Sequence, residues 1–240
     1  MAITHRNSQT YASDSSTGSL IFTKPTGTLE GDILVAFIVY SSAGDTINPP
    51  TGFVEIEGGT GTTSVTAKSY YKVAGDSEPT TYSFTSATTH GRAGVLSSFY
   101  DSTGGGSWNI EDSSETRESS ANSITSASVT AVDDSMLVIG WTNDDNEDIT
   151  TAPTDMILAG FIKFSHIWSC SATSYYESRS SGAVTKSITW GGSAEELTAQ
   201  AVVLTYAAAT GTNTQINIGD DWKEIAAAQI NIGDTWKTVF

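Results

Sequence analysis

The sequence is short of the residues on which many functional sites depend. A single cysteine, Cys170, excludes an internal disulfide and a zinc site built on cysteines, and we expect its thiol to be buried and inert. The three histidines, His5, His90 and His166, lie too far apart in sequence for a metal-binding motif. There is no Gly-x-Ser-x-Gly, phosphate-loop or dinucleotide motif. A glycosidase pair could be drawn from any of the 27 acidic residues, but no motif marks one, so we predict a protein that is not an enzyme.

Basic residues are also scarce. The chain has 11 Lys and Arg against 27 Asp and Glu, which gives a formal net charge of −16. Nucleic-acid binding depends on Lys and Arg that neutralise phosphates, so this balance argues against a nucleic-acid partner and against an anionic membrane surface. The acidity indicates either solubility with suppressed self-association or cation binding at clustered carboxylates. The first of these interpretations is favoured.

Long apolar runs are missing. No run reaches the roughly 18 residues that a membrane-spanning helix needs. The first residues, MAITHRNSQTYASDSS, contain no apolar signal-peptide segment. We therefore expect a protein that is made in the cytosol without a signal peptide and does not insert into a membrane.

Sustained helical periodicity is absent as well. The best helical candidates, residues 194–201 and 222–228, are short, whereas Val, Ile, Thr and Tyr recur in short runs between many of the 22 glycines. Such runs suit pleated, half-buried strands joined by tight turns. Residues 33–40 are apolar at every position, which predicts a central strand buried on both faces. We predict an all-β fold.

An internal duplication organises the chain. Residues 31–53 return as residues 134–156 without a gap, so that Leu34 falls on Leu137 and Pro50 on Pro153. Three further echoes follow in the same order: Ser69-Tyr70-Tyr71 with Ser174-Tyr175-Tyr176, Tyr82-Ser83-Phe84 with Ile188-Thr189-Trp190, and Val95-Leu96 with Val202-Val203. The pattern predicts a jelly-roll-like β-sandwich built from two duplicated halves.

The duplication divides the chain into four parts. Residues 1–103 are the first half, with residues 1–18 as an extended lead-in, and residues 123–209 are the second half. Residues 104–122 are rich in Gly, Ser and charge, which is typical of a linker. About six strands per half are expected. Periodicity leaves open whether the halves form one sandwich or two, and a single body is favoured because separate halves would expose strand edges.

The C-terminal part, residues 210–240, contains the most specific signal in the sequence. Residues 215–223 repeat 14 positions later as residues 229–237, and each unit is typical of a strand, a Gly-Asp turn and a second strand. Two such hairpins cannot bury their apolar side chains alone, so an attachment role is favoured over docking on the sandwich. The predicted partner-binding residues are Ile216, Ile218, Trp222, Lys223, Ile230, Ile232, Trp236 and Lys237.

One acidic loop is a candidate cation site. Asp144, Asn146 and Asp148 have the spacing of a calcium loop. However, Ile149 stands where an EF-hand needs Gly, and Asp155 stands where it needs Glu. A solvated loop is the preferred interpretation, so no cofactor is predicted and calcium is the one candidate.

Four tryptophans offer a second kind of binding element. Trp108, Trp141, Trp168 and Trp190 are suited either to stacking on sugars or to core packing. Their alternating spacing favours the core.

Several motifs resemble a family known from the structural gene regions of tailed bacteriophages and from bacterial surface proteins. The matching segments are Gly31-Asp32-Ile33-Leu34-Val35-Ala36, Pro49-Pro50-Thr51-Gly52, Tyr70-Tyr71-Lys72-Val73-Ala74 and Glu78-Pro79-Thr80-Thr81-Tyr82-Ser83-Phe84-Thr85. The family usually has Trp at the position of Phe53. The C-terminal Ile-x-Ile-Gly-x-x-Trp-Lys repeats are similar to terminal tags on phage tail and fibre proteins. The resemblance implies a duplicated β-sandwich with a virion or cell-surface role, and no catalytic residues.

These observations give two expectations for function. The first is a structural protein on the exterior of a phage particle, a capsid decoration or a head, neck or tail fibre, anchored through one terminus. Its partners would be other virion proteins and copies of itself, and it would reach the virion from the host cytoplasm. The second is a recognition module that binds host glycans through the loops 41–50 and 143–153.

Overall fold

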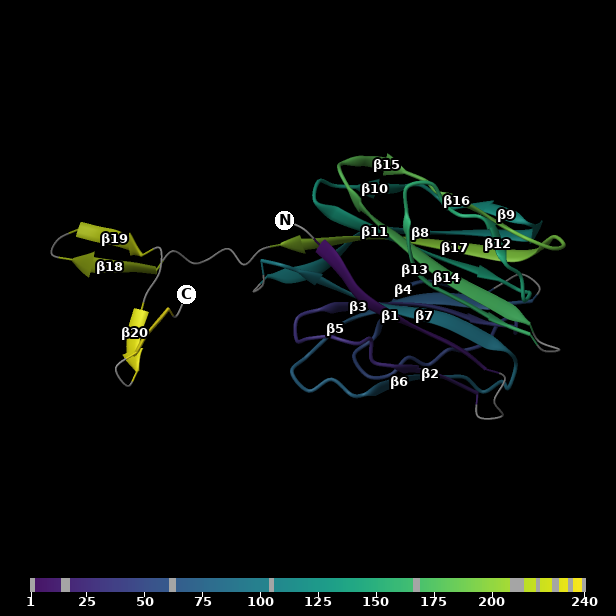
Figure 1. Cartoon of the computed structure of the whole chain (residues 1–240), viewed down its shortest axis with the longest axis horizontal. Helices are drawn as coiled ribbons and strands as arrows, with labels where there is room; N and C mark the ends of the chain where they lie inside the picture. Colours follow the sequence, from purple (N-terminus) through teal and green to yellow (C-terminus); the bar gives the residue numbers. More distant parts are fainter. Residues whose placement is uncertain are drawn as a thin grey trace.

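The computed structural model describes residues 3–13, 18–60, 64–103, 106–165 and 169–207, together with the backbone of four short C-terminal strands. Strands β1 to β17 form one body, and strands β18 to β21 follow it as two hairpins (Figure 1). Among the described residues every regular element is a strand, and no helix could cross a membrane. The predicted all-β fold is confirmed.

Two five-stranded antiparallel sheets form the centre of the body. The first has the order β1 (Ile3–Ser13), β7 (Arg92–Asp101), β3 (Ile33–Tyr40), β5 (Thr66–Val73) and β4 (Val54–Thr60). The second has the order β8 (Ser107–Ala121), β17 (Glu195–Ala207), β11 (Ser135–Asn143), β14 (Cys170–Arg179) and β13 (Ile157–Phe164). We call strands β1 to β7 the first copy and strands β8 to β17 the second copy.

Three smaller sheets complete the body. The first copy contributes β2 (Ser19–Thr23) paired with β6 (Thr81–Thr85). The second copy contributes β9 (Ser123–Thr125), β16 (Ser187–Trp190) and β12 (Ile149–Thr151), and a pair formed by β10 (Val129–Ala131) and β15 (Gly182–Val184). These 17 strands exceed the roughly twelve expected, in part because two expected strands, residues 124–129 and 184–190, are each split into two.

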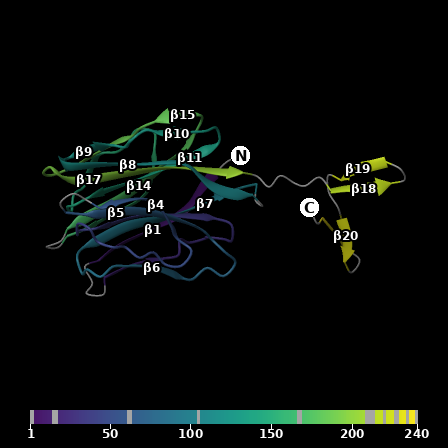
Figure 2. The ribbon, with the colours of Figure 1, turned by 180° about the vertical axis from the view of Figure 1, so that it is seen from behind.

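The sheets are stacked in layers, with the two large sheets face to face and the small sheets outside them (Figures 1 and 2). Val35 and Phe37 of β3 pack in one cluster with Val138 of β11 and Val202 of β17, so the two copies share a core. The opposite face of β3 packs against β2 and β6, and that of β11 packs against β9 and β16. Both central strands are therefore buried on both faces, as predicted for β3. The label jelly-roll stays a prediction.

The two large sheets repeat one another strand by strand. Val35 pairs with Tyr71 and Ser97, and its counterpart Val138 pairs with Tyr176 and Val202. The β-bulges recur as well. Ile56 in β4 and Ala159 in β13 are equivalent extra residues, and so are Arg6 in β1 and Glu111 in β8. Shared order, register and bulges confirm the duplication.

Register also corrects one detail of the predicted alignment. Val202 and Val203 of β17 occupy the places of Ser97 and Ser98 in β7, so pairing them with Val95-Leu96 was wrong by two residues. A shift of two keeps every side chain on its own face of the sheet, so the apolar alternation could not reveal the error.

The two copies pack with the geometry of a twofold. Strand β1 of the first copy lies against β13 of the second copy, and β4 of the first copy lies against β8 of the second. Strands β1 and β8 are equivalent in the two copies, and so are strands β4 and β13. These two contacts between the copies are therefore counterparts with the roles of the copies exchanged, as in a homodimer.

The predicted linker, residues 104–122, is wrong. Most of it is β8, a 15-residue strand that pairs with β17 along the edge of the second large sheet. Residues 3–13 of the predicted lead-in likewise form β1, at the edge of the first large sheet. Edge strands carry polar side chains and few apolar ones, and for this reason their sequences look like connecting segments.

The C-terminal part forms the predicted pairs of strands. β18 (Thr214–Ile218) pairs with β19 (Asp221–Ile225), and β20 (Gln229–Ile232) pairs with β21 (Thr235–Thr238). The predicted Gly-Asp turns lie outside the described residues, as do all side chains of this part. Figure 1 shows the described strands of both hairpins beyond the end of β17, away from the layers of the body.

Candidate functional site

The two loops expected to recognise glycans meet at one end of the body. Ser41 Oγ donates a hydrogen bond to Asp144 Oδ1 at 3.4 Å, and the backbone N of Asp144 donates to the carbonyl of Glu196 at 3.1 Å. Ser41 follows β3 and Asp144 follows β11, so equivalent loops of the two copies converge because the central strands run side by side through the core.

Asp144 lies in an acidic, half-buried environment at this end. The pKa of its carboxyl group is raised to about 6, chiefly by burial and also by the carboxylates of Glu196 and Glu195, while hydrogen bonds from Ser64 and Ser41 lower it. The side chain of Asp144 therefore joins the two copies and is not directed outward as a ligand.

Two of the three calcium candidates have side-chain partners elsewhere. Asp144 is directed toward Ser41, and the carboxylate of Asp148 forms an ion pair with Lys163 at 2.8 Å. The backbone N of Asn146 donates to the carboxylate of its neighbour Asp145 at 2.7 Å. Within the described part of the chain, no three His, Cys, Asp or Glu side chains are placed to hold a metal.

The tryptophans divide between core and surface. Trp141 and Trp190 are fully buried in the core of the second copy, so core packing is confirmed for them. Trp108 is half-buried between the two copies at their edge, and Trp168 lies outside the described residues. Cys170 is buried in the shared core, and this burial raises the pKa of its thiol, as an inert cysteine requires.

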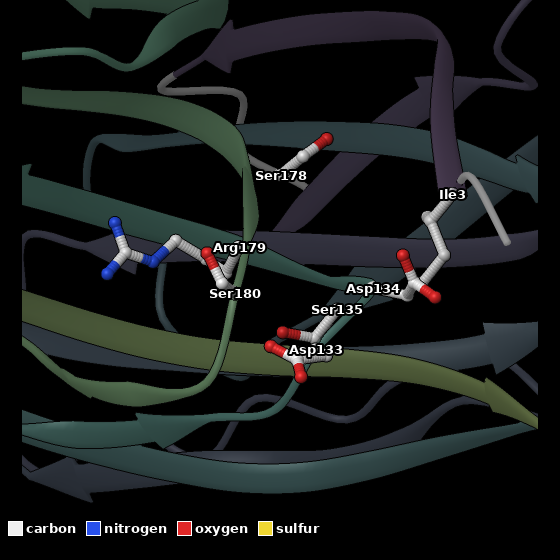
Figure 3. A pocket seen from close by; sticks show the side chains of 7 residues that line it. All are labelled: Ile3, Asp133, Asp134, Ser135, Ser178, Arg179 and Ser180. Carbon is white, nitrogen blue, oxygen red and sulfur yellow. The ribbon is translucent and has the colours of Figure 1, made fainter.

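A cavity of about 460 Å³ lies beside the turn that leads into β11 (Figure 3). It is lined by Ile3, Asp133, Asp134, Ser135, Ser178, Arg179 and Ser180. Ser135 Oγ donates to the carbonyl of Val132 at 2.6 Å, and Arg179 is paired with Glu177 at 3.0 Å. In Figure 3 the guanidinium group of Arg179 points away from the carboxylates of Asp133 and Asp134. The lining provides no histidine or cysteine, and its serine hydroxyl at residue 135 is engaged with backbone.

One histidine contact was missed by sequence reasoning. His5 Nε2 and Ser8 Oγ lie 2.7 Å apart, and Ser8 Oγ lies 2.8 Å from Ser97 Oγ. The His5 ring stacks on Tyr176 at 4.5 Å and meets the edge of Phe99 at 5.3 Å. Burial lowers the pKa of His5, so this group closes the seam between the copies as a neutral ring. The bulge at Arg6 brings the side chains of His5 and Ser8 to the same face of the sheet. The bulge is visible only in the pairing register of β1 with β7, so the sequence could not reveal the contact.

The predicted attachment residues occupy matching places in the two hairpins. Ile216 pairs with Lys223 as Ile230 pairs with Lys237, and Trp222 and Trp236 each pair with an asparagine. The remaining two residues, Ile218 and Ile232, are the last of β18 and β20. The hairpins are thus two copies of one backbone unit. Comparison with known proteins finds no match among family models, curated proteins or solved structures. A function can therefore be argued only from the chain itself.

Proposed function

We propose that the protein is a non-enzymatic structural component of the exterior of a bacteriophage particle, anchored by its C-terminal hairpins. The observation that carries the proposal is the repetition of one hairpin, in the same register, after a body whose core is already complete. An isolated two-stranded hairpin is marginally stable in water, so the pair needs a surface to pack against. Two closely similar units in tandem fit a partner that offers the same surface more than once.

The body is suited to display. Its large sheets are covered on their outer faces by the small sheets, and the chain carries a net charge of −16. Such charge keeps neighbouring copies soluble and apart when many are held at high local density. The partners would be other virion proteins and neighbouring copies of this chain.

Truncation after Ala207 tests the attachment. A phage encoding residues 1–207 should yield particles that lack the protein, whereas particles with the full chain carry it, as measured by quantitative mass spectrometry of purified particles. The truncated chain should retain the circular dichroism spectrum of the body, because the shared core lies within residues 3–207. Equal occupancy of the two forms would reject the hairpins as the anchor.

A second candidate is a glycan-binding module at the converging loops 41–50 and 143–153. The contact between Ser41 and Asp144 favours it, because it brings both predicted recognition loops to one surface. Glycan-array binding that is lost in an Asn146→Ala and Asp148→Ala double variant would support it.

A further inference from the structure

A groove runs along the seam between the two large sheets, where β4 of the first copy meets β8 of the second. Its volume is about 320 Å³, within the range of small-ligand pockets. It is lined by Val54, Glu55, Ile56, Tyr71, Trp108, Asn109, Ile110 and Ser113. We call these residues the edge groove. Its mouth is open, since Val54 is 52% exposed.

Trp108 is held rigidly in the edge groove. Its indole Nε1 donates a hydrogen bond of 2.7 Å to the carbonyl of Gly31, and Tyr206 packs edge-on against it with 5.0 Å between ring centroids. A ring fixed in this way loses little rotamer freedom when a ligand stacks on it. Trp108 is therefore a preformed aromatic platform.

The duplication supplies an internal comparison for this groove. The equivalents of Trp108, Ile110 and Tyr71 in the other seam are Ile3, His5 and Tyr176. There the His5 ring covers Tyr176 by stacking at 4.5 Å. In the edge groove, Ile110 stands in place of the His5 ring, and Tyr71 lines the groove. The two copies have therefore diverged so that one seam is filled by rings and the other is lined by them.

The polar residues of the edge groove define the charge of a ligand. Glu55 and Asn109 stand at its exposed rim, where Glu55 Oε2 accepts a hydrogen bond from Lys68 Nζ at 2.7 Å and keeps its other oxygen for a ligand. Ser113 Oγ donates to Glu57 Oε1 at 2.7 Å. Asn109 in turn donates to Glu111 at 3.1 Å. Carboxylates around the groove repel anions, while carboxylate and amide oxygens accept hydrogen bonds from hydroxyl groups.

We propose that the edge groove binds an uncharged saccharide of one or two rings. The apolar face of a sugar ring stacks on Trp108, and its hydroxyl groups donate to Glu55 and Asn109. A neutral sugar can both stack on the aromatic platform and donate hydrogen bonds to the acidic rim. A phosphorylated or sialylated glycan is repelled by the carboxylates around the groove. The edge groove lies in the body and does not include the C-terminal hairpins. It is also separate from the loops 41–50 and 143–153, which form the other candidate glycan site.

The test uses the full-length protein on an array of neutral oligosaccharides, followed by calorimetric titration of the strongest binder. We expect Trp108→Ala to weaken binding at least tenfold and Val54→Arg to abolish it by blocking the mouth. Val54 is exposed, so its variant keeps the fold even if Trp108→Ala does not. Leu158→Ala is the matched control, because Leu158 is the equivalent of Glu55 in the other seam and is 50% exposed. Its affinity should stay within twofold of the parent.

Two results would overturn the proposal. One is an array on which no neutral saccharide binds. The other is a titration in which Val54→Arg and Trp108→Ala bind the saccharide with the same affinity as Leu158→Ala. This includes the case in which only the double variant of the loop, Asn146→Ala with Asp148→Ala, loses binding. Residues 1–207 should bind the saccharide as the full chain does, so a failure of the hairpin anchor leaves this result unchanged.

Discussion

Phe37 packs directly onto Gly140, which is the residue at its own position in the other copy. The central strands β3 and β11 meet where the twofold relation brings equivalent positions together. Two phenylalanines would collide there, and two glycines would leave a void. A single duplicated chain can have Phe at this position in one copy and Gly in the other. Two identical subunits cannot, because both would carry the same residue. The asymmetric pair therefore fills the contact between the two central strands within the shared core.

Substitution of Gly140 should be costly. A Cβ atom at this position would overlap the Phe37 ring. We expect Gly140→Ala to lower the free energy of unfolding by about 2–3 kcal/mol, as overpacking in a well-filled core does. Urea denaturation measures the effect.

Gly191→Ala is the control for that substitution, because its Cβ would lie 3.5 Å from its nearest neighbour, Glu147 Oε2. It should change stability by less than about 1 kcal/mol. Combining Gly140→Ala with Phe37→Ala should cost less than the sum of the two single changes. Additive costs would show that the two positions do not touch.

Asp144 should make the protein less stable as pH rises. Burial raises the pKa of its carboxyl group to about 6, so the folded state binds more protons than the unfolded state between about pH 4 and pH 6. Stability contributed by the neutral acid is present below this window and is lost across it. Asp144→Asn should remove the loss and raise stability above pH 6, by on the order of 1 kcal/mol after allowance for solvent screening.

Urea denaturation at pH 4, 5, 6, 7 and 8 measures this difference. Asp148→Asn is the control, because Asp148 forms an exposed ion pair with Lys163. Parallel pH profiles for the parent and Asp144→Asn would contradict the buried placement of Asp144.

His5 should have the opposite dependence. Burial lowers the pKa of His5 below its ordinary value of about 6.5, so below that pH the unfolded state binds more protons. The contribution of neutral His5 to stability is therefore fully present above about pH 6.5. It falls as the pH drops below 6.5 toward the lowered pKa of the folded state. Phe at position 5 keeps the stacking on Tyr176 but cannot take up a proton.

Thermal melts of His5→Phe between pH 5 and pH 7.5 check this expectation. The loss of melting temperature on acidification should be smaller than in the parent chain. An identical slope in the parent and His5→Phe would place the acid sensitivity elsewhere.

Sequence alone was sufficient where the signal was local. Residues 33–40 are apolar throughout, and the strand they form is buried on both faces. The 14-residue repeat predicted two hairpins, and both have the same register. The Leu34 and Leu137 alignment located the central strands of both copies. Such features depend on side-chain period within one segment, which the sequence displays directly.

Features that depend on contacts between distant segments could not be predicted. β8 is polar because it lies at an edge, and its partner β17 is distant in sequence, with pairs that range from Ala121 with Glu195 to Ser107 with Ala207. The His5 and Ser8 contact needs a bulge, and the Phe37 and Gly140 contact needs the stacking of two sheets. The edge groove combines residues of both copies, so neither copy by itself contains its pattern.

The position of the chain on a particle tests the attachment most directly. Cryo-electron microscopy of purified phage particles should show the sandwich on the outside, with the end at which β17 finishes facing the particle and density for the C-terminal hairpins at the contact. A map in which the body is absent, or in which it contacts the particle through the loops 41–50 and 143–153, would contradict the account.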